Sequence, residues 1–124
     1  MTSQFKGVGV ALVTPFHTDG SIDFAAYQRL IDHVIEGGVD YVVALGTTGE
    51  SPTLSIKEKY EVLDKTVEFV QKRVPIVGGF GGNNTLDVLK SIKGYHFNGV
   101  DAILSVSPAY SKPTQEGIYQ HYKA

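Results

Sequence analysis

"YVVALGTTGESPTLS", residues 41–55, contains the strand and helix signals on which the fold prediction rests. An apolar run from Tyr41 to Leu45 ends in Gly46, and a helix signal follows, because Ser55 and Glu58 form an S-x-x-E capping box. A short, continuous apolar run followed by a capped helix is typical of a strand–helix unit in a parallel sheet.

Three further apolar runs precede helical patterns, and we predict strands for Val8–Val13, for a run led by Ile76 and Val77, and for Ala102–Val106. All the runs are short and mostly continuous, which predicts strands that are buried on both faces. The sequence therefore predicts an α/β protein with four βα units.

Start and stop residues delimit the other helices. Asp23 is expected to cap the first helix, which the glycine pair at 37–38 ends. Thr85 is expected to cap the third helix, which Asn98-Gly99 closes, and Pro113-Thr114 opens the fourth.

An internal repeat gives the size of one unit. Gly38-Val39-Asp40 precedes the second strand, and Gly99-Val100-Asp101 precedes the fourth, 61 residues later (38 to 99). Two units lie between them, so one unit is about 30 residues, and eight would make roughly 250, the usual size of a (β/α)8 TIM barrel. Residues 1–124 are thus expected to be a single domain, either half of such a barrel or an open four-stranded parallel sheet.

Composition excludes several classes of function. The net charge is −2 with no block of like charge, which argues against a nucleic-acid partner. Cysteine is absent and the four histidines are scattered, so no metal site is predicted. No signal peptide is recognised and no apolar run approaches the roughly 18–20 residues of a membrane span, so we expect a soluble cytoplasmic protein.

Candidate site residues lie in the segments that follow the strands, because both architectures place ligands at the carboxyl ends of their strands. The four segments are Thr14–Gly20, Gly46–Thr53, Gly78–Asn84 and Ser107–Pro113. Thr47 and Thr48 offer two hydroxyls between glycines, which suits a small carboxylate or phosphate; the alternative is a plain turn that caps the next helix. The loop GGFGGNNT (78–85) could cradle a phosphate or form a permissive turn. Tyr110 could relay a proton or simply pack at a contact.

A nucleophilic lysine is missing from these loops. A lysine that attacks a carbonyl must be desolvated so that its pKa falls, and the end of a buried strand is the natural place for it. None of the lysines occupies such a place, and Lys112, the nearest, is expected to point into water.

Four stretches carry a resemblance to a known family. GVGVALVTPF, GTTGES, GGFGGNNT and SPAYSKPTQEGIYQHYKA resemble, in order and spacing, the first half of the dihydrodipicolinate synthase family of pyruvate-dependent class I aldolases. The resemblance implies a (β/α)8 parent of roughly 290 residues. It also implies a lyase that condenses pyruvate with aspartate semialdehyde through a lysine Schiff base in lysine (diaminopimelate) biosynthesis. Such a parent needs no cofactor and forms a dimer or a dimer of dimers.

Matched residue by residue, Thr47 and Thr48 resemble the pair that receives the pyruvate carboxylate. Thr48 and Tyr110 resemble members of a proton relay, in which the tyrosine is lent across a dimer interface. A lysine-feedback site is matched only in part. The residues of this chain that match it are Ser51, Asn83 and Asp87, whereas Ile56 and Lys59 replace its polar positions.

The family's Schiff-base lysine would follow Ala124, so we expect residues 1–124 to be inactive alone. An uncovered half-barrel is also expected to dimerise or swap. Two other interpretations stay open. One is a different pyruvate-dependent aldolase, such as an N-acetylneuraminate lyase-like or keto-sugar-acid enzyme, although the KPTQEGIYQHYKA tail favours the synthase. The other is a non-enzymatic α/β module that binds small carboxylates.

Overall fold

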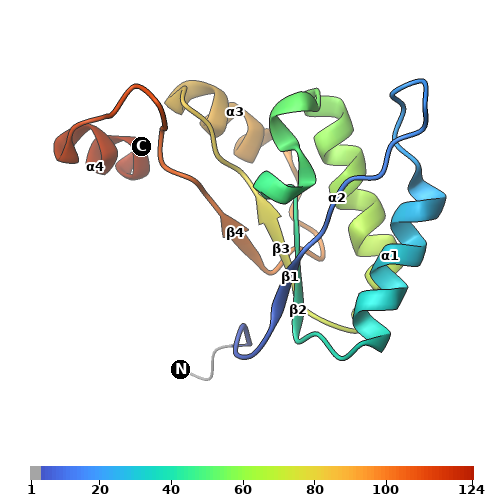
Figure 1. The fold of residues 1–124 in the computed structure, drawn as a ribbon. Coiled ribbons are helices and arrows are strands. Elements are labelled where there is room, and N and C mark those ends of the chain that lie inside the picture. Colours follow the sequence, from blue (N-terminus) through green and yellow to red (C-terminus); the bar gives the residue numbers. More distant parts are fainter. Residues whose placement is uncertain (1–3) are drawn as a thin grey trace.

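Four parallel strands form one sheet in the computed structural model, which describes residues 4–124 (Figure 1). The strands are β1 (Gly9–Ala11), β2 (Tyr41–Ala44), β3 (Ile76–Gly79) and β4 (Ala102–Leu104), and they lie side by side in the order of the chain. A helix follows each strand: α1 (Phe24–Glu36), α2 (Ile56–Val70), α3 (Thr85–Gly94) and α4 (Gln115–Lys123). The prediction of four βα units is confirmed.

The first and last strands are shorter than predicted. Regular pairing of β1 with β2 covers only Gly9–Ala11, and that of β4 with β3 ends where Leu104 meets Gly79. β4 has a neighbour on one side only among residues 4–124, so its pairing stops where β3 stops. The predicted extensions to Val13 and Val106 were therefore wrong.

The hydrophobic core lies between the sheet and helices α1 and α2, which cover the same face of the sheet (Figure 1). Fully buried apolar side chains of β2 meet those of both helices; they include Val42, Ala44, Ile31 and Leu63. At about 25 cal/mol per Å² of apolar surface, each of the three larger side chains (Val42, Ile31 and Leu63) contributes roughly 1.5–3 kcal/mol. This layer fixes the positions of the strands.

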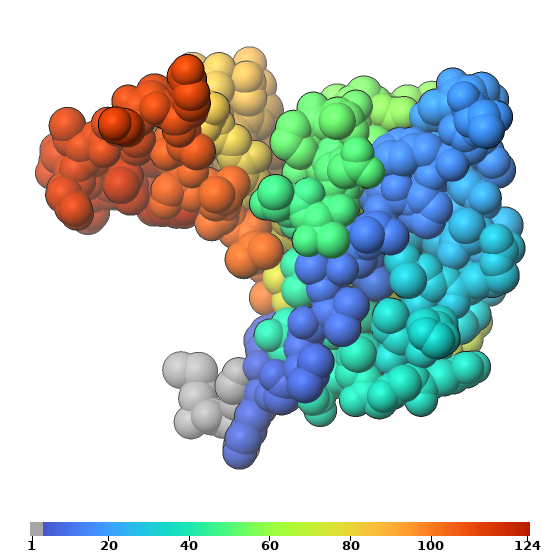
Figure 2. All heavy atoms as spheres, viewed as in Figure 1, coloured from blue at the N-terminus to red at the C-terminus, as the bar shows by residue number. Residues whose placement is uncertain are grey.

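The opposite face of the sheet is uncovered. An added Cβ at Gly78 would touch Leu63 of α2, so position 78 faces the helices. Ile103 pairs with Gly78 and shares that face. Since side chains alternate along a strand, Leu104 lies on the face away from the helices. Leu104 is 50% exposed there, and Ala11 is also exposed. The predicted burial of every strand on both faces was therefore wrong for β1 and β4. Figure 2 shows a hollow on this side of the sheet, between the segment drawn in blue and the C-terminal quarter of the chain, drawn in orange and red.

The Gly-Val-Asp repeat holds neighbouring strands in register. Asp40 accepts a hydrogen bond from the Val8 N–H at its Oδ2 (2.7 Å), and its own N–H donates to the Val8 carbonyl (2.8 Å). Asp101 makes the same two bonds with Ile76, at 2.9 and 2.8 Å. Each aspartate follows a glycine with φ near +88° (Gly38 at 88°, Gly99 at 87°), a conformation that favours glycine.

The helix caps are mostly those predicted. Asp23 accepts from the Ala26 N–H (2.8 Å), and Ser55 and Glu58 form the complete capping box. Thr114 caps α4.

The prediction that Thr85 caps α3 was wrong. Asn84 accepts from the Leu86 N–H (3.1 Å) instead, and Thr85 is the first helical residue. The Thr85 hydroxyl lies 2.7 Å from Nδ1 of the buried His121, so it joins α3 to α4.

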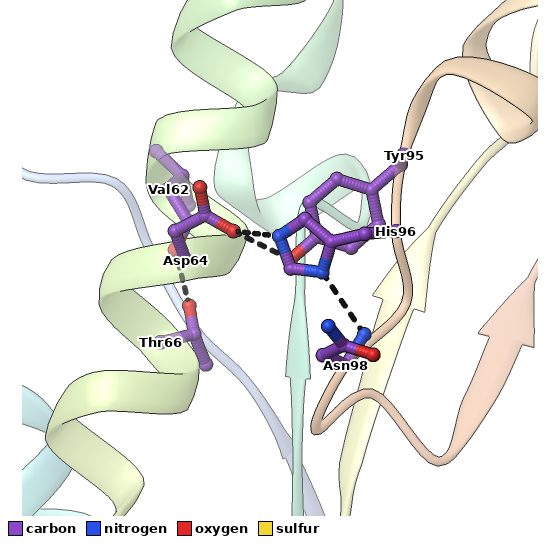
Figure 3. Close-up of polar contacts among 6 residues, drawn as sticks. All are labelled: Val62, Asp64, Thr66, Tyr95, His96 and Asn98. Atoms are coloured by element: carbon purple, nitrogen blue, oxygen red, sulfur yellow. Dashed lines mark hydrogen bonds and ion pairs between the residues drawn. The ribbon is translucent and has the colours of Figure 1, made fainter.

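Helix α3 also ends earlier than predicted, at Gly94 rather than at Asn98-Gly99, because the next residues bind α2 (Figure 3). The Tyr95 hydroxyl donates to Asp64 Oδ1 (2.9 Å), and His96 Nε2 lies 3.0 Å from the same oxygen. The Asn98 N–H donates to His96 Nδ1 (3.0 Å), so the imidazole proton is on Nε2 and points at Asp64. Burial, with the Asp64 carboxylate beside it, raises the pKa of Tyr95.

A buried tyrosine makes the stability of the fold sensitive to alkaline pH. Tyr27 is 1% exposed, and burial raises its pKa to about 12. The Thr66 hydroxyl donates to the Val62 carbonyl, so the Tyr27 hydroxyl, 2.9 Å away, must donate to Thr66. The neutral phenol is therefore the form that the core accepts.

Raising the pH from 9 to 12 should lower the free energy of unfolding through Tyr27. The folded pKa exceeds the unfolded pKa of about 10, so this contribution is complete below pH 10 and is lost as the pH rises through 12. The limiting loss is about 3 kcal/mol. Urea unfolding of the native chain and of Tyr27→Phe measures it, since lysines and other tyrosines titrate alike in both. Equal pH dependence in the two proteins would contradict the assignment.

Candidate functional site

All four predicted site segments lie at the carboxyl edge of the sheet, directly after the strands. The loop after β2 is held against the end of β1, because the buried Thr14 hydroxyl donates to the Gly49 carbonyl (2.7 Å). The loop after β3 is held against β4, since the Phe80 N–H donates to the Leu104 carbonyl (2.9 Å). The four loops therefore form one contiguous edge.

The GTTGES loop consists of two short 3-10 turns, η1 (Thr47–Gly49) and η2 (Ser51–Thr53). Leu45 and Glu50 precede them with φ of 58° and 55°, which is uncommon for residues other than glycine. The Leu45 side chain stays in the core at 4% exposure while its backbone turns away from the strand. The loop is thus held by strained backbone at two positions.

Gly79 makes room for this turn. A Cβ at Gly79 would lie 2.0 Å from the Leu45 carbonyl oxygen, which is far inside contact distance. Gly78 and Gly79, which the sequence assigns to a loop, are the last two residues of β3. The contact with Leu45 is a structural reason for glycine at position 79.

Thr47 and Thr48 present unused donors at this edge. Both residues are exposed, and neither hydroxyl nor backbone N–H has a hydrogen-bond partner within residues 4–124. The bonds of η1 and its C-cap run from Gly49 to Gly46 and from Glu50 to Thr47, and Ser55 caps the next helix. The alternative of a plain turn whose threonines cap α2 does not hold.

The side-chain oxygens of both asparagines in the loop GGFGGNNT accept hydrogen bonds from backbone N–H groups. Asn84 caps α3, and Asn83 Oδ1 accepts from the Ala109 N–H at 2.8 Å. This is the behaviour that the permissive-turn interpretation predicts.

Tyr110 projects away from the molecule. Its residue is 100% exposed, with φ at +67°, and the Ser111 N–H donates to the Ala109 carbonyl across it (2.8 Å). Within residues 4–124 the structure gives it no hydrogen bond to Thr48. The two proposed relay residues therefore do not meet within one copy of the chain.

Ser51, Asn83 and Asp87 line one pocket of about 740 Å³, between α2 and α3. Ile56 and Lys59 also line it. The structure thus brings together the three residues that only the family resemblance had joined.

No lysine in the described part of the chain is buried, and Lys112 is exposed, as predicted. No group of three His, Asp or Glu side chains within residues 4–124 is placed to hold a metal ion. None of the helices found there is long and apolar enough to cross a membrane.

Sequence reasoning missed Thr14 and Gly79 as parts of the site's frame. A hydroxyl residue directly after the first strand was an available signal for Thr14. The clash that explains Gly79 depends on the unusual φ of Leu45, which no local pattern indicates.

Comparison with known proteins agrees with this geometry. The model of the dihydrodipicolinate synthetase family matches residues 4–124. The 4-hydroxy-tetrahydrodipicolinate synthase of Parabacteroides distasonis is 54% identical over 121 residues, which are 98% of this chain and 41% of that protein. The Bacillus subtilis synthase is 48% identical over 121 residues, 98% of this chain and 42% of the relative. The chain thus spans about two fifths of these relatives.

A solved structure shows the same fold. The chloride-inhibited dihydrodipicolinate synthase from Acinetobacter baumannii, complexed with pyruvate, superposes with a TM-score of 0.91 at 44% identity. The match covers 96% of this chain and 41% of that one. The fold is therefore that of the first four βα units of a TIM barrel. It is not the alternative open sheet, because helices would cover both faces of a doubly wound sheet.

Gly79→Ala should destabilise the fold by about 2–3 kcal/mol, because the new methyl group meets a backbone carbonyl that cannot move aside. Gly82→Ala, three residues further along the chain, is the matched control, since its Cβ would lie 3.4 Å from the Val88 side chain. Urea unfolding of both variants gives the comparison. Equal stability of the two would show that Leu45 does not hold the conformation described.

Proposed function

The chain belongs to the dihydrodipicolinate synthetase family, and from that premise we propose that it supplies part of an active site that joins pyruvate to aspartate semialdehyde. The observation that carries the proposal is the pair of exposed threonines, Thr47 and Thr48, whose hydroxyls and backbone N–H groups lack partners within residues 4–124. Exposed donors without partners suit a carboxylate, which offers only acceptors.

The proposed chemistry divides into binding and covalent steps. The threonine pair holds the pyruvate carboxylate, while a lysine amine attacks the keto carbon and water leaves to form a Schiff base. A proton then leaves the methyl carbon, and the resulting enamine adds to the aldehyde. The protonated imine accepts the electron pair, so the mechanism requires neither a metal nor an organic cofactor.

We infer that the reacting lysine lies outside residues 4–124. No lysine of residues 4–124 is buried, and a lysine that attacks a carbonyl must be desolvated. The described segment therefore provides binding and proton transfer rather than the nucleophile.

Thr48 and Tyr110 are proposed to move the protons of the Schiff-base steps. A tyrosine that is 100% exposed has no partner on its own surface, which suits a phenol that reaches the site of a second copy. Tyr119 and Tyr122 of α4, the helix that follows this loop, are also more than half exposed, at 56% and 51%. We therefore propose a homo-oligomer whose contact includes the Tyr110 loop.

Feedback by free lysine is not part of this proposal. Lys59 and Lys90 both line the pocket that holds Ser51, Asn83 and Asp87. Two ammonium groups against one carboxylate disfavour a ligand that carries another positive charge at its side chain.

A non-enzymatic carboxylate-binding module is the second candidate. The observation that favours it is the lack of a buried lysine in the described segment. It shares the threonine seat with the first candidate and differs from it in lacking any covalent step.

Pyruvate titrated into the ¹⁵N-labelled 124-residue chain should shift the amide signals of Thr47 and Thr48 at millimolar concentration. Thr47→Val with Thr48→Val should abolish these shifts, whereas Thr53→Val in η2 should leave them unchanged. A parallel titration with lysine should leave Ser51, Asn83 and Asp87 unshifted. Pyruvate shifts spread evenly over the surface would contradict the proposed seat.

Borohydride reduction in the presence of pyruvate should leave the mass of the 124-residue chain unchanged, because no desolvated amine is available to form the imine. The Bacillus subtilis synthase serves as the positive control for trapping. A mass increase equal to one reduced pyruvate would show that a lysine of this segment reacts after all.

A chimera in which residues 1–124 replace the matching part of the Bacillus subtilis synthase tests the catalytic roles. Thr48→Val and Tyr110→Phe should each lower kcat for the condensation about 100-fold, the scale of a lost proton-transfer group. Tyr119→Phe, also exposed and aromatic, is the matched control and should keep full activity. Full activity of Tyr110→Phe would remove the phenol from the mechanism.

A further inference from the structure

Tyr110 occupies a strained turn. The Ser111 N–H donates to the Ala109 carbonyl (2.8 Å), which closes a three-residue turn with Tyr110 at its centre and φ at +67°. A positive φ at the central residue marks the classic form of the γ-turn, which is rare and strained. Lys112 follows with φ at +49°, so two non-glycine residues in this loop lie in the left-handed region.

Side-chain packing does not hold this turn in place. Every residue from Ala109 to Lys112 is exposed, and Tyr110 is fully so. A strained backbone persists only where its surroundings enforce it. Within one copy of the chain, the restraint therefore acts on the main chain.

Asn83 supplies that restraint from another loop. Its Oδ1 accepts from the Ala109 N–H at 2.8 Å, so Ala109 is bonded at its N–H to Asn83 and at its carbonyl to Ser111. Asn83 itself lies between two fixed points, since Phe80 is bonded to Leu104 and Asn84 caps α3. The anchor thus connects a rigid strand end to the strained turn.

We propose that Asn83 is a positioning residue for Tyr110. By holding Ala109 it keeps the γ-turn formed and the phenol directed away from its own surface. The catalytic role of Asn83 rests on the proposed function, in which Tyr110 transfers protons in a neighbouring site. The role of Asn83 in holding the turn does not depend on that function. A group that must reach a donor or acceptor at hydrogen-bond distance loses rate when its loop samples other conformations.

The first test measures the anchor by NMR in the 124-residue chain. In Asn83→Ala, exchange of the Ala109 amide proton should accelerate about fivefold, the scale of one exposed hydrogen bond, and the Tyr110 order parameter should fall. Asn83→Asp keeps an oxygen acceptor at the same position and should preserve both values. Asn98→Ala is the matched control, because the Asn98 side chain makes no hydrogen bond within residues 4–124. Unchanged exchange and order in Asn83→Ala would overturn the proposal.

The second test uses the chimera with the Bacillus subtilis synthase and separates the two proposals. Asn83→Ala should lower kcat about tenfold with KM for pyruvate unchanged, and Asn83→Asp should restore it. In a Tyr110→Phe background, Asn83→Ala should cause no further loss, because the positioned group is already absent. Independent, additive losses would overturn the positioning role. If Tyr110→Phe is fully active while the NMR effects persist, the proposed function fails and the anchor stands.

Discussion

Asp40 and Asp101 provide the constraint on which the rest of the structure depends. Each aspartate binds both backbone polar groups of a residue at the start of a neighbouring strand. A slip of one residue in a parallel pair would turn every side chain to the other face, so these four hydrogen bonds fix which residues enter the core. They also fix the height at which each strand ends, and the site is built at those ends.

The site is made by backbone geometry more than by charged side chains. Leu45 turns the chain with a positive φ, Gly79 makes room for its carbonyl, and Thr14 holds the following loop at Gly49. These contacts leave Thr47 and Thr48 exposed with free donors. Donors held in advance by a rigid frame bind an anion without first losing conformational entropy, which is the physical advantage of this arrangement.

Local signals predicted the parts of the fold that short-range chemistry controls. The capping box at Ser55 and Glu58 is an interaction between residues three apart, and sequence alone located it. The end of α3 was misjudged because Tyr95 leaves the helix to bind Asp64, 31 residues away. The sequence indicated Asn83 only as part of a feedback site or a permissive turn, whereas its bond to Ala109 spans 26 residues of chain. Contacts of that range depend on the assembled sheet, and no spacing in the sequence reports them.

The full exposure of Tyr110 has a genetic meaning if its phenol serves a second copy. The Thr48 and the Tyr110 of one proton relay would then come from two different copies of the chain. A chain that had lost Thr48 could still lend its tyrosine, and a chain that had lost Tyr110 could still hold substrate. Two defective alleles of this kind would complement each other in a mixed assembly, because one pairing of subunits reunites the intact residues.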